Sequence, residues 1–458
     1  MFRKDAKDIF DVEIPDSGIM DSYIQRWYNI TAGNPEWTNK EDEIFTLNFA
    51  QFIDEVTSGL VALDIGVSLP DSPRGKLLQN AVDYVLQKIG DTVSDALGNA
   101  GIMFKPNGET IDYFMPDRFT PTSWDSNGNI DGCIFIEQAD IGDKHYFKYE
   151  YHRYEDYDGE RAYAISNRAF VSTSTANKGK PCELSAVPKW AKLQPDTYLL
   201  NIERPLFAYY GNPKPNTVDR YSPLSMPIWA NCLNELRDLD IAWSRKSAEI
   251  EDSKHITFLP ETALQYAEHR NIKLPRFLKG IQTGNIENNA IHEHTATLLT
   301  ADRIADINAT LAMISSKLGF DQGFFVLNEK TGAITATQVE ADDQSTIRTI
   351  KNLRDPLKNA LIQTLYAVNK FADLFSDVPP EPWTTNYQSM AGELSDAFNF
   401  GDITYSFEED KASWWKYRIQ GDVPAWMYYA KFEGMSENEA KAMIAETQQT
   451  PTLFGEEE

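Results

Sequence analysis

Residues 299–320, LTADRIADINATLAMISSKLGF, contain the most regular helical pattern in the chain. Thr300 is expected to cap the first turn of this helix, and Gly319 stands where a glycine commonly ends one. At a rise of about 1.5 Å per residue, the helix would be roughly 28 Å long. Its apolar residues alternate between spacings of three and four and therefore share one face: Ile304, Ile307, Leu311, Ile314 and Leu318.

A second helix is expected just upstream, within residues 223–252, starting near Met226 with Pro227 in its first turn and Ser225 as its cap. Between the two helices, residues 253–299 predict a small insertion of strands with a short helix at 260–270. The insertion contains five basic and four acidic residues, whereas the rest of the chain contains 38 basic and 65 acidic residues. The upstream residues expected to pack along the helix pair are Trp229, Leu236 and Trp243. The basic residues of the insertion are Lys254, Arg270, Lys273, Arg276 and Lys279.

Downstream, FDQGFFVLNEKTGAI (320–334) predicts a loop rich in glycine, followed by a long helix that reaches about Phe375. The sequence Thr337-Gln-Val-Glu340 has the pattern of a capping box at the start of that helix. The acids at 340–343 could form a catalytic cluster, but acids in a first helical turn more commonly complement the helix dipole. Pro356 lies inside the helical pattern, so we expect a kink there.

The first 222 residues combine two kinds of pattern. Residues 1–110 predict mainly helices, with amphipathic stretches at 41–58 and 75–99. Residues 110–222 alternate aromatic and polar residues between turns at Gly142 and at Asp158-Gly159, which predicts antiparallel strands. With a helical segment and a frayed tail expected over 411–458, the fold class is α+β.

Motifs for catalysis, cofactors or metals are weak. No phosphate-binding loop of the Gly-x-x-x-x-Gly-Lys-Ser/Thr type and no Gly-x-Ser-x-Gly elbow occurs. His292 and His294 could offer two imidazoles from one strand face, but a polar strand or turn is the favoured interpretation, as is a solvated strand for His145 to His152. We expect no catalytic residue, no metal and no cofactor, and we expect free thiols at Cys133, Cys182 and Cys232.

Composition restricts the partners. Hydrophobic residues make up 42% of the 458, enough for a sizeable core, and the formal net charge is −26. Such an acidic chain is a poor candidate for gripping nucleic acid over a broad surface, although DNA could slide past it without sticking. We expect neither a signal peptide nor a membrane span, because no apolar run approaches about 20 residues.

The order of these parts resembles the portal proteins of tailed bacteriophages, in particular the type common in long-tailed phages of Gram-positive bacteria. Residues 299–320 resemble the returning stem helix of that family, which ends in a Leu-Gly pair. KTGAITATQVEADDQSTIRTI (330–350) is similar to a Lys-Thr-Ala-Thr-Glu-Val element, with Gly-Ala-Ile inserted and Gln338 in place of Glu. GMSENEAKAMIAE (434–446) resembles the closing Gly-x-Ser-x-x-Glu-Ala helix. The resemblance covers most of 220–450, and residues 1–220 match loosely.

The resemblance implies an elongated subunit with a wing (1–222), a stem helix (223–252), a clip (253–299), a returning stem helix (300–319), a tunnel loop (320–335), a kinked wing helix with a return strand (336–410) and a crown (411–458). Twelve copies would form a ring at one capsid vertex of the virion, assembled in the host cytoplasm. The basic clip residues would dock the terminase large subunit and the head–tail connector. The major capsid and scaffolding proteins would be further partners. The residues implied to face the passing double-stranded DNA are Asn328, Lys330, Thr331 and Gly332.

Two alternatives remain open at this stage. One is an enzyme associated with the phage head, with a site that the motifs do not reveal. The other is a minor capsid or scaffolding protein that lacks a central channel.

Overall fold

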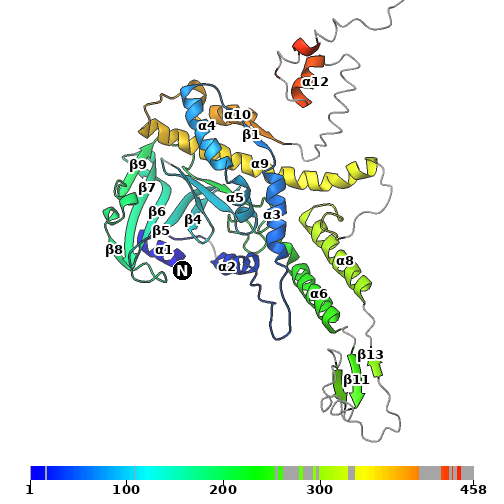
Figure 1. Cartoon of the computed structure of the whole chain (residues 1–458). Coiled ribbons are helices and arrows are strands. Elements are labelled where there is room, and N and C mark those ends of the chain that lie inside the picture. The colour runs from blue at the N-terminus through cyan, green and yellow to red at the C-terminus, as the bar shows by residue number, and fades with distance from the viewer. Residues whose placement is uncertain are drawn as a thin grey trace, which may run out of the picture. The chain divides into compact units, whose positions relative to one another are not determined.

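The computed structural model describes residues 2–15, 18–108, 110–252, 256–260, 278–281, 292–294, 299–327, 336–401, 424–432, 436 and 441–444. The chain divides into two compact units, residues 1–399 and 400–458, which are considered separately. The first contains antiparallel sheets together with long helices (Figure 1), so the expected α+β class is confirmed at that level.

A six-stranded antiparallel sheet lies in the first unit, in the order β4-β5-β6-β7-β8 with β9 also paired to β7. Gly142 (φ 59°) turns β5 into β6, and Asp158 (φ 55°) with Gly159 (φ 82°) turns β6 into β7. One left-handed residue at the first turn and two at the second suit tight hairpins, so both predicted turns are confirmed. The strands are β4 (Phe119–Trp124), β5 (Ile130–Ile141), β6 (Lys144–Tyr157), β7 (Glu160–Ser172), β8 (Lys180–Cys182) and β9 (Asp196–Leu200).

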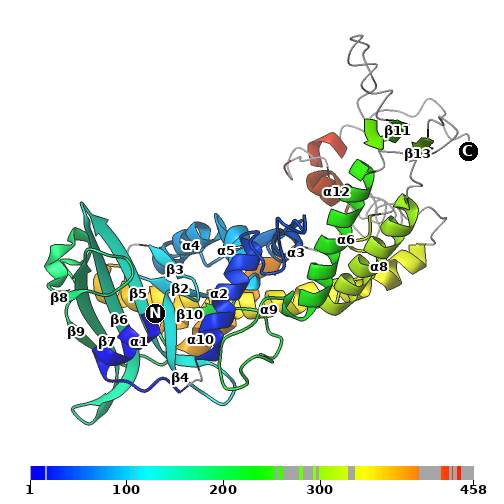
Figure 2. The ribbon, with the colours of Figure 1, turned by 90° about the horizontal axis from the view of Figure 1, so that it is seen from below.

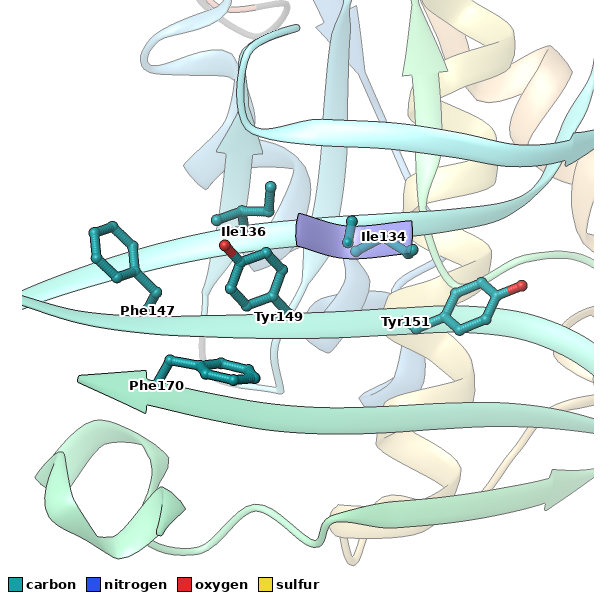
Figure 3. Close-up of a cluster of buried hydrophobic side chains, with 7 residues drawn as sticks. Ile134, Ile136, Phe147, Tyr149, Tyr151 and Phe170 are labelled. Carbon is teal, nitrogen blue, oxygen red and sulfur yellow. The ribbon is translucent and has the colours of Figure 1, made fainter. Parts of the chain in front are cut away.

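One face of this sheet forms an aromatic core. Cross-strand pairing sets Ile134 opposite Tyr151, Ile136 opposite Tyr149 and Phe147 opposite Phe170, and Figure 3 shows these six side chains gathered on neighbouring strands. Helix α1 (Phe2–Phe10) packs Ala6, Ile9 and Phe10 against them.

The opposite face buries an ionic network. Glu150 accepts hydrogen bonds from Lys105 Nζ and Lys148 Nζ, both at 2.8 Å, and its side chain is 10% exposed. Burial alone would raise the pKa of Glu150, but the two ammonium charges outweigh it and hold that pKa well below its usual range. His152 contacts the same carboxylate at 2.7 Å, and burial lowers the pKa of this imidazole.

The expectation of a solvated strand from His145 to His152 is therefore wrong. Residues 147–152 are buried, because α1 covers one face while the other holds the ionic network. The two histidines do lie on opposite faces, as a spacing of seven requires: His145 stays partly exposed beside Asp140, whereas His152 is 1% exposed.

Helices and a second sheet make up the rest of the body. The predicted amphipathic helix at 41–58 begins only at Phe49, because residues 39–44 form turns and an isolated bridge. The sheet runs in the order β10-β2-β3, and β1 pairs with β14, a short return strand. The elements are α2 (Ile19–Thr31), α3 (Phe49–Val61), β1 (Ile65–Val67), α4 (Pro73–Leu86), α5 (Ile89–Leu97), β2 (Ile102–Pro106), β3 (Ile111–Phe114), β10 (Ala208–Tyr210), α10 (Tyr387–Ala397) and β14 (Phe398–Phe400).

Helix α9 (Ala336–Phe375) is the longest element and passes beside α3, α4, β2 and β10. Two arginines fix it. Arg354 donates to the carbonyl oxygens of Leu60 at 2.9 Å and Val61 at 3.1 Å, at the end of α3. Arg74, fully buried on α4, bonds Asp373 Oδ1 at 2.9 Å, so α9 is held firmly by the body at two levels.

In the second unit, α12 (Ala425–Phe432) is described, and residues 441–444 are helical. The helical segment expected within 411–458 is confirmed at α12. The three cysteines are free. No described helix combines the length and apolar character needed to cross a membrane.

Candidate functional site

The candidate site is the helical hairpin of α6 (Leu233–Asp252) and α8 (Thr300–Leu318), together with the segment that joins α8 to α9. The two helices pack along one another, as Figure 2 shows. Leu236 and Leu239 of α6 are buried. Four of the five residues predicted on α8 are also buried, namely Ile307, Leu311, Ile314 and Leu318, and Ile304 is half-buried.

Helix α6 starts later than expected. The predicted start near Met226 is wrong, because residues 224–229 are extended or turned and a short 3-10 helix (Ala230–Cys232) precedes α6. Ser225 does not cap a helix there: its hydroxyl oxygen accepts from the hydroxyl of Tyr209 at 3.0 Å. Trp229, expected on the hairpin, is fully buried in the body, where its indole donates to Asp54 at 3.0 Å.

Trp243 is half-buried on α6 and carries the ammonium of Lys246 over its ring at 4.1 Å. Asp240 connects the same helix to the loop before α3. Its carboxylate accepts from the indole of Trp37 and from the N–H of Leu47, both at 2.8 Å. Burial raises the pKa of Asp240, so these two donors matter most when the carboxylate is charged.

Each end of the hairpin is closed by polar contacts. At the distal end Glu249 accepts from the N–H of Leu299 at 2.8 Å and pairs with Arg303. The expected Thr300 cap is wrong: Thr300 lies inside the first turn, Leu299 is the N-cap residue, and the N–H of Leu299 is satisfied by the carboxylate of Glu249. At the other end Lys317 pairs with Glu235.

Gly319 ends α8 as predicted, with φ 91° in the left-handed region. The N–H groups of Gly319 and Phe320 both return to the carbonyl oxygen of Ser315, at 3.1 and 2.9 Å. Thr349 of α9 donates to the carbonyl oxygen of Gly319 at 2.6 Å. Lys214 adds contacts to the carbonyl oxygens of Lys317 and Leu318, and burial lowers the pKa of Lys214.

The segment 320–327 is held in place, contrary to the expectation of one loose loop over 320–335. Phe325 is buried against Phe49 and Phe52 of α3, with ring centroids 5.4 and 6.0 Å away. The N–H of Leu327 donates to Asn308 at 3.0 Å, so the segment folds back along α8. The described part of the expected tunnel loop is therefore fixed, and its remaining part, 328–335, lies outside the described residues.

The expected long helix after the loop is α9. The helix begins at Ala336, one residue before the predicted start, and the side chains of Thr337 and Glu340 lie outside the described residues, so the capping box stays a prediction. The helix continues through Pro356 without interruption. Proline has no N–H to donate to the carbonyl of Asn352, and both residues line a pocket of about 450 Å³ beside Phe320 and Thr349.

Most predicted docking and channel residues lie outside the described residues: Asn328, Lys330, Thr331, Gly332, Lys254, Arg270, Lys273 and Arg276. The backbone of Lys279 lies in β12 (Leu278–Ile281), which pairs in parallel with β11 (Ile256–Pro260). The strand β13 (His292–His294) completes a three-stranded sheet, so the HEH sequence is a strand. Within the described ranges, no three His, Cys, Asp or Glu side chains are grouped so that they could hold a metal.

Sequence patterns missed two parts of this site. The aromatic contacts of 320–327 could have been suspected from the phenylalanines in FDQGFF, which are unusual in a loop expected to be loose. The roles of Thr349 and Lys214 had no such signal, because each bonds a backbone carbonyl far away in the sequence.

No protein-family model matches the chain, and a search of curated proteins finds no match. The function is therefore inferred from the hairpin and its connections to the body.

Proposed function

We propose that the chain is a phage portal protein, twelve copies of which form a ring around a channel for double-stranded DNA at one capsid vertex. The observation that carries this proposal is the order in which the hairpin helices, the small sheet between them and the long helix α9 follow one another along the chain. Two packed helices, α6 and α8, bracket a small sheet, and the turn that ends α8 is held by Thr349 of the 40-residue helix α9. That order of parts is the one implied by the resemblance, in which they serve as stem, clip and wing.

Two fixed points, Leu327 before segment 328–335 and Arg354 farther along α9 after it, support the assignment of this segment as the tunnel loop. A loop that meets moving DNA must transmit force to the body without displacing the helices around it. Leu327 is tied to α8, and α9 is tied to α3 through Arg354. The net charge of −26 further supports a channel that DNA passes without adhering to its wall.

In this proposal the protein acts through assembly and positioning and performs no catalysis. The clip docks the terminase large subunit and the head–tail connector, and the wing and crown contact capsid and scaffolding proteins. The protein assembles in the host cytoplasm and remains in the virion.

The test is microscopy and mass measurement of the purified chain. Negative-stain images of a portal show uniform rings with a central channel, and mass photometry gives a multiple near twelve of 52.0 kDa. A monomer that cleaves DNA in the presence of a divalent metal would favour an enzyme associated with the phage head. A closed particle with no channel would favour a minor capsid or scaffolding protein.

A further inference from the structure

A pocket of about 300 Å³ opens between α2, α3 and α5, away from the hairpin. Asp54 of α3 lines this pocket and is 2% exposed. One carboxylate oxygen, Oδ2, accepts from the indole of Trp229 at 3.0 Å. The other oxygen, Oδ1, is buried and has no hydrogen-bond partner among the described residues.

The local sequence makes room for this carboxylate. A Cβ atom on Gly98 would lie 2.5 Å from Asp54 Oδ2, so only glycine fits there without movement. Asp95, at the exposed rim, also lines the pocket, and it lines an adjoining hollow together with Asp91 and Glu55. No lysine or arginine of the described part of the chain pairs with Asp54, Asp95 or Asp91.

A buried carboxylate with one donor and acidic neighbours is unfavourable in its charged form. Burial raises the pKa of Asp54 well above its ordinary value, the hydrogen bond from Trp229 opposes this, and the charges of Asp95 and Glu55 add to it. Burial and Asp91 also raise the pKa of Asp95. A cationic group entering the pocket would supply the missing partner and restore the charged carboxylate.

The size and chemistry of the pocket suit a guanidinium group better than a metal ion. A metal site needs several ligand atoms directed at one position, and the described residues contain no group of three His, Cys, Asp or Glu side chains that could hold a metal. A guanidinium instead forms two parallel hydrogen bonds to one carboxylate and packs flat against an aromatic ring. Asp54 Oδ1 offers the acceptor, Asp95 a second charge, and Tyr28 an aromatic ring in the wall.

We propose that this pocket receives an arginine side chain from a second copy of the chain, an inference that rests on the ring assembly proposed above. Neighbouring subunits of a ring contact through two different surfaces, so an acidic pocket on one surface requires a basic group on the other. Three described arginines are exposed and have no hydrogen-bond, ion-pair or aromatic partner among the described residues: Arg220, Arg245 and Arg348. These three are the candidates for the inserted side chain.

The test uses the full chain with Asp54→Asn, which keeps the shape of the side chain but cannot carry its charge. Ring dissociation is followed by mass photometry over a dilution series, and the melting temperature of the separated subunit is measured alongside. We expect the half-dissociation concentration to rise on the order of 30-fold or more, since one partner of a buried charge pair is lost. The melting temperature of the separated subunit should hold or rise, because the unpaired buried acid has been removed.

The matched control is Asp64→Asn, at an exposed acid whose left-handed backbone (φ 50°) asparagine also tolerates. It should leave the rings unchanged. If Asp54→Asn prevents folding, Asp95→Asn at the rim replaces it. One of Arg220→Gln, Arg245→Gln and Arg348→Gln should reproduce the weakening and add nothing to Asp54→Asn.

Rings that are equally stable in Asp54→Asn, in Asp95→Asn and in all three arginine variants would overturn the inference while leaving the portal proposal intact. So would a Ca²⁺-dependent rise in melting temperature that Asp54→Asn abolishes, since the pocket would then be a metal site. A wild-type chain that forms no ring would overturn both proposals.

Discussion

Replacing Gly319 by alanine tests whether the turn at the end of α8 is built as described. Gly319 has φ 91°, and a Cβ atom there would lie 2.7 Å from the hydroxyl oxygen of Thr349. That hydroxyl donates to the carbonyl oxygen of Gly319 at 2.6 Å. One methyl group therefore strains the backbone and displaces the side chain that ties α9 to α8.

The expected cost follows from these two effects. A left-handed conformation costs an L-residue about 1–2 kcal/mol. Loss of the hydrogen bond from Thr349 adds about 1 kcal/mol. Together they predict a loss of about 2–3 kcal/mol, which lowers the melting temperature of a unit of this size by about 2–4 °C.

Scanning calorimetry on the full chain provides the measurement. Gly392→Ala is the matched control: that glycine lies inside α10, and a Cβ there meets nothing within 4 Å. It should stabilise the protein by about 0.5–1 kcal/mol. In a Thr349→Ala background, Gly319→Ala should cost only the backbone strain. A Gly319→Ala protein as stable as the wild type would refute the description of this turn.

Three further predictions concern the ionic network, the clip and the loop. Glu150→Gln should cost about 3–5 kcal/mol, because buried Lys105 loses its carboxylate partner and Lys148 keeps only Glu137. The folded pKa of Glu150 is lowered, so its stabilisation is full above the unfolded pKa and declines as pH falls through the folded pKa. This part of the acid dependence in a pH series of melting curves should disappear in the variant. Replacing Lys273, Arg276 and Lys279 together by glutamate should weaken terminase or connector binding in a pull-down while rings remain intact. Unchanged DNA packaging in this variant would contradict the docking role assigned to the clip. Shortening 327–333 should leave rings intact but impair DNA translocation or retention, and loss of ring formation would contradict the tunnel-loop assignment.

Periodic sequence patterns predicted the long elements well. The apolar residues of α8 and α9 recur with a helical spacing, and most of them are buried in the structure. Gly319 marks the end of α8 because glycine readily adopts the left-handed conformation found there. The hairpins of the large sheet were predicted from the alternation of aromatic and polar residues and from the turn residues at 142, 158 and 159, which are left-handed in the structure. In each case the determinant is local in the sequence.

The errors arose where distant contacts decide the structure. Trp229 looked like a residue of a stem helix, but its hydrogen bond to Asp54 and its burial keep residues 224–229 out of helix α6. Thr300 was the obvious cap, yet it lies inside the first turn, and Glu249 of the preceding helix accepts from the N–H of Leu299. The pocket at Asp54 had no signal in the sequence, because its residues come together only when α2, α3 and α5 pack.

The most direct test of the portal proposal is a class-averaged image of the purified full-length chain by electron microscopy, combined with its mass in solution. The account predicts a uniform ring with an open central channel and a mass near twelve times 52.0 kDa. A monomer or dimer, or a closed particle with no channel, would contradict it.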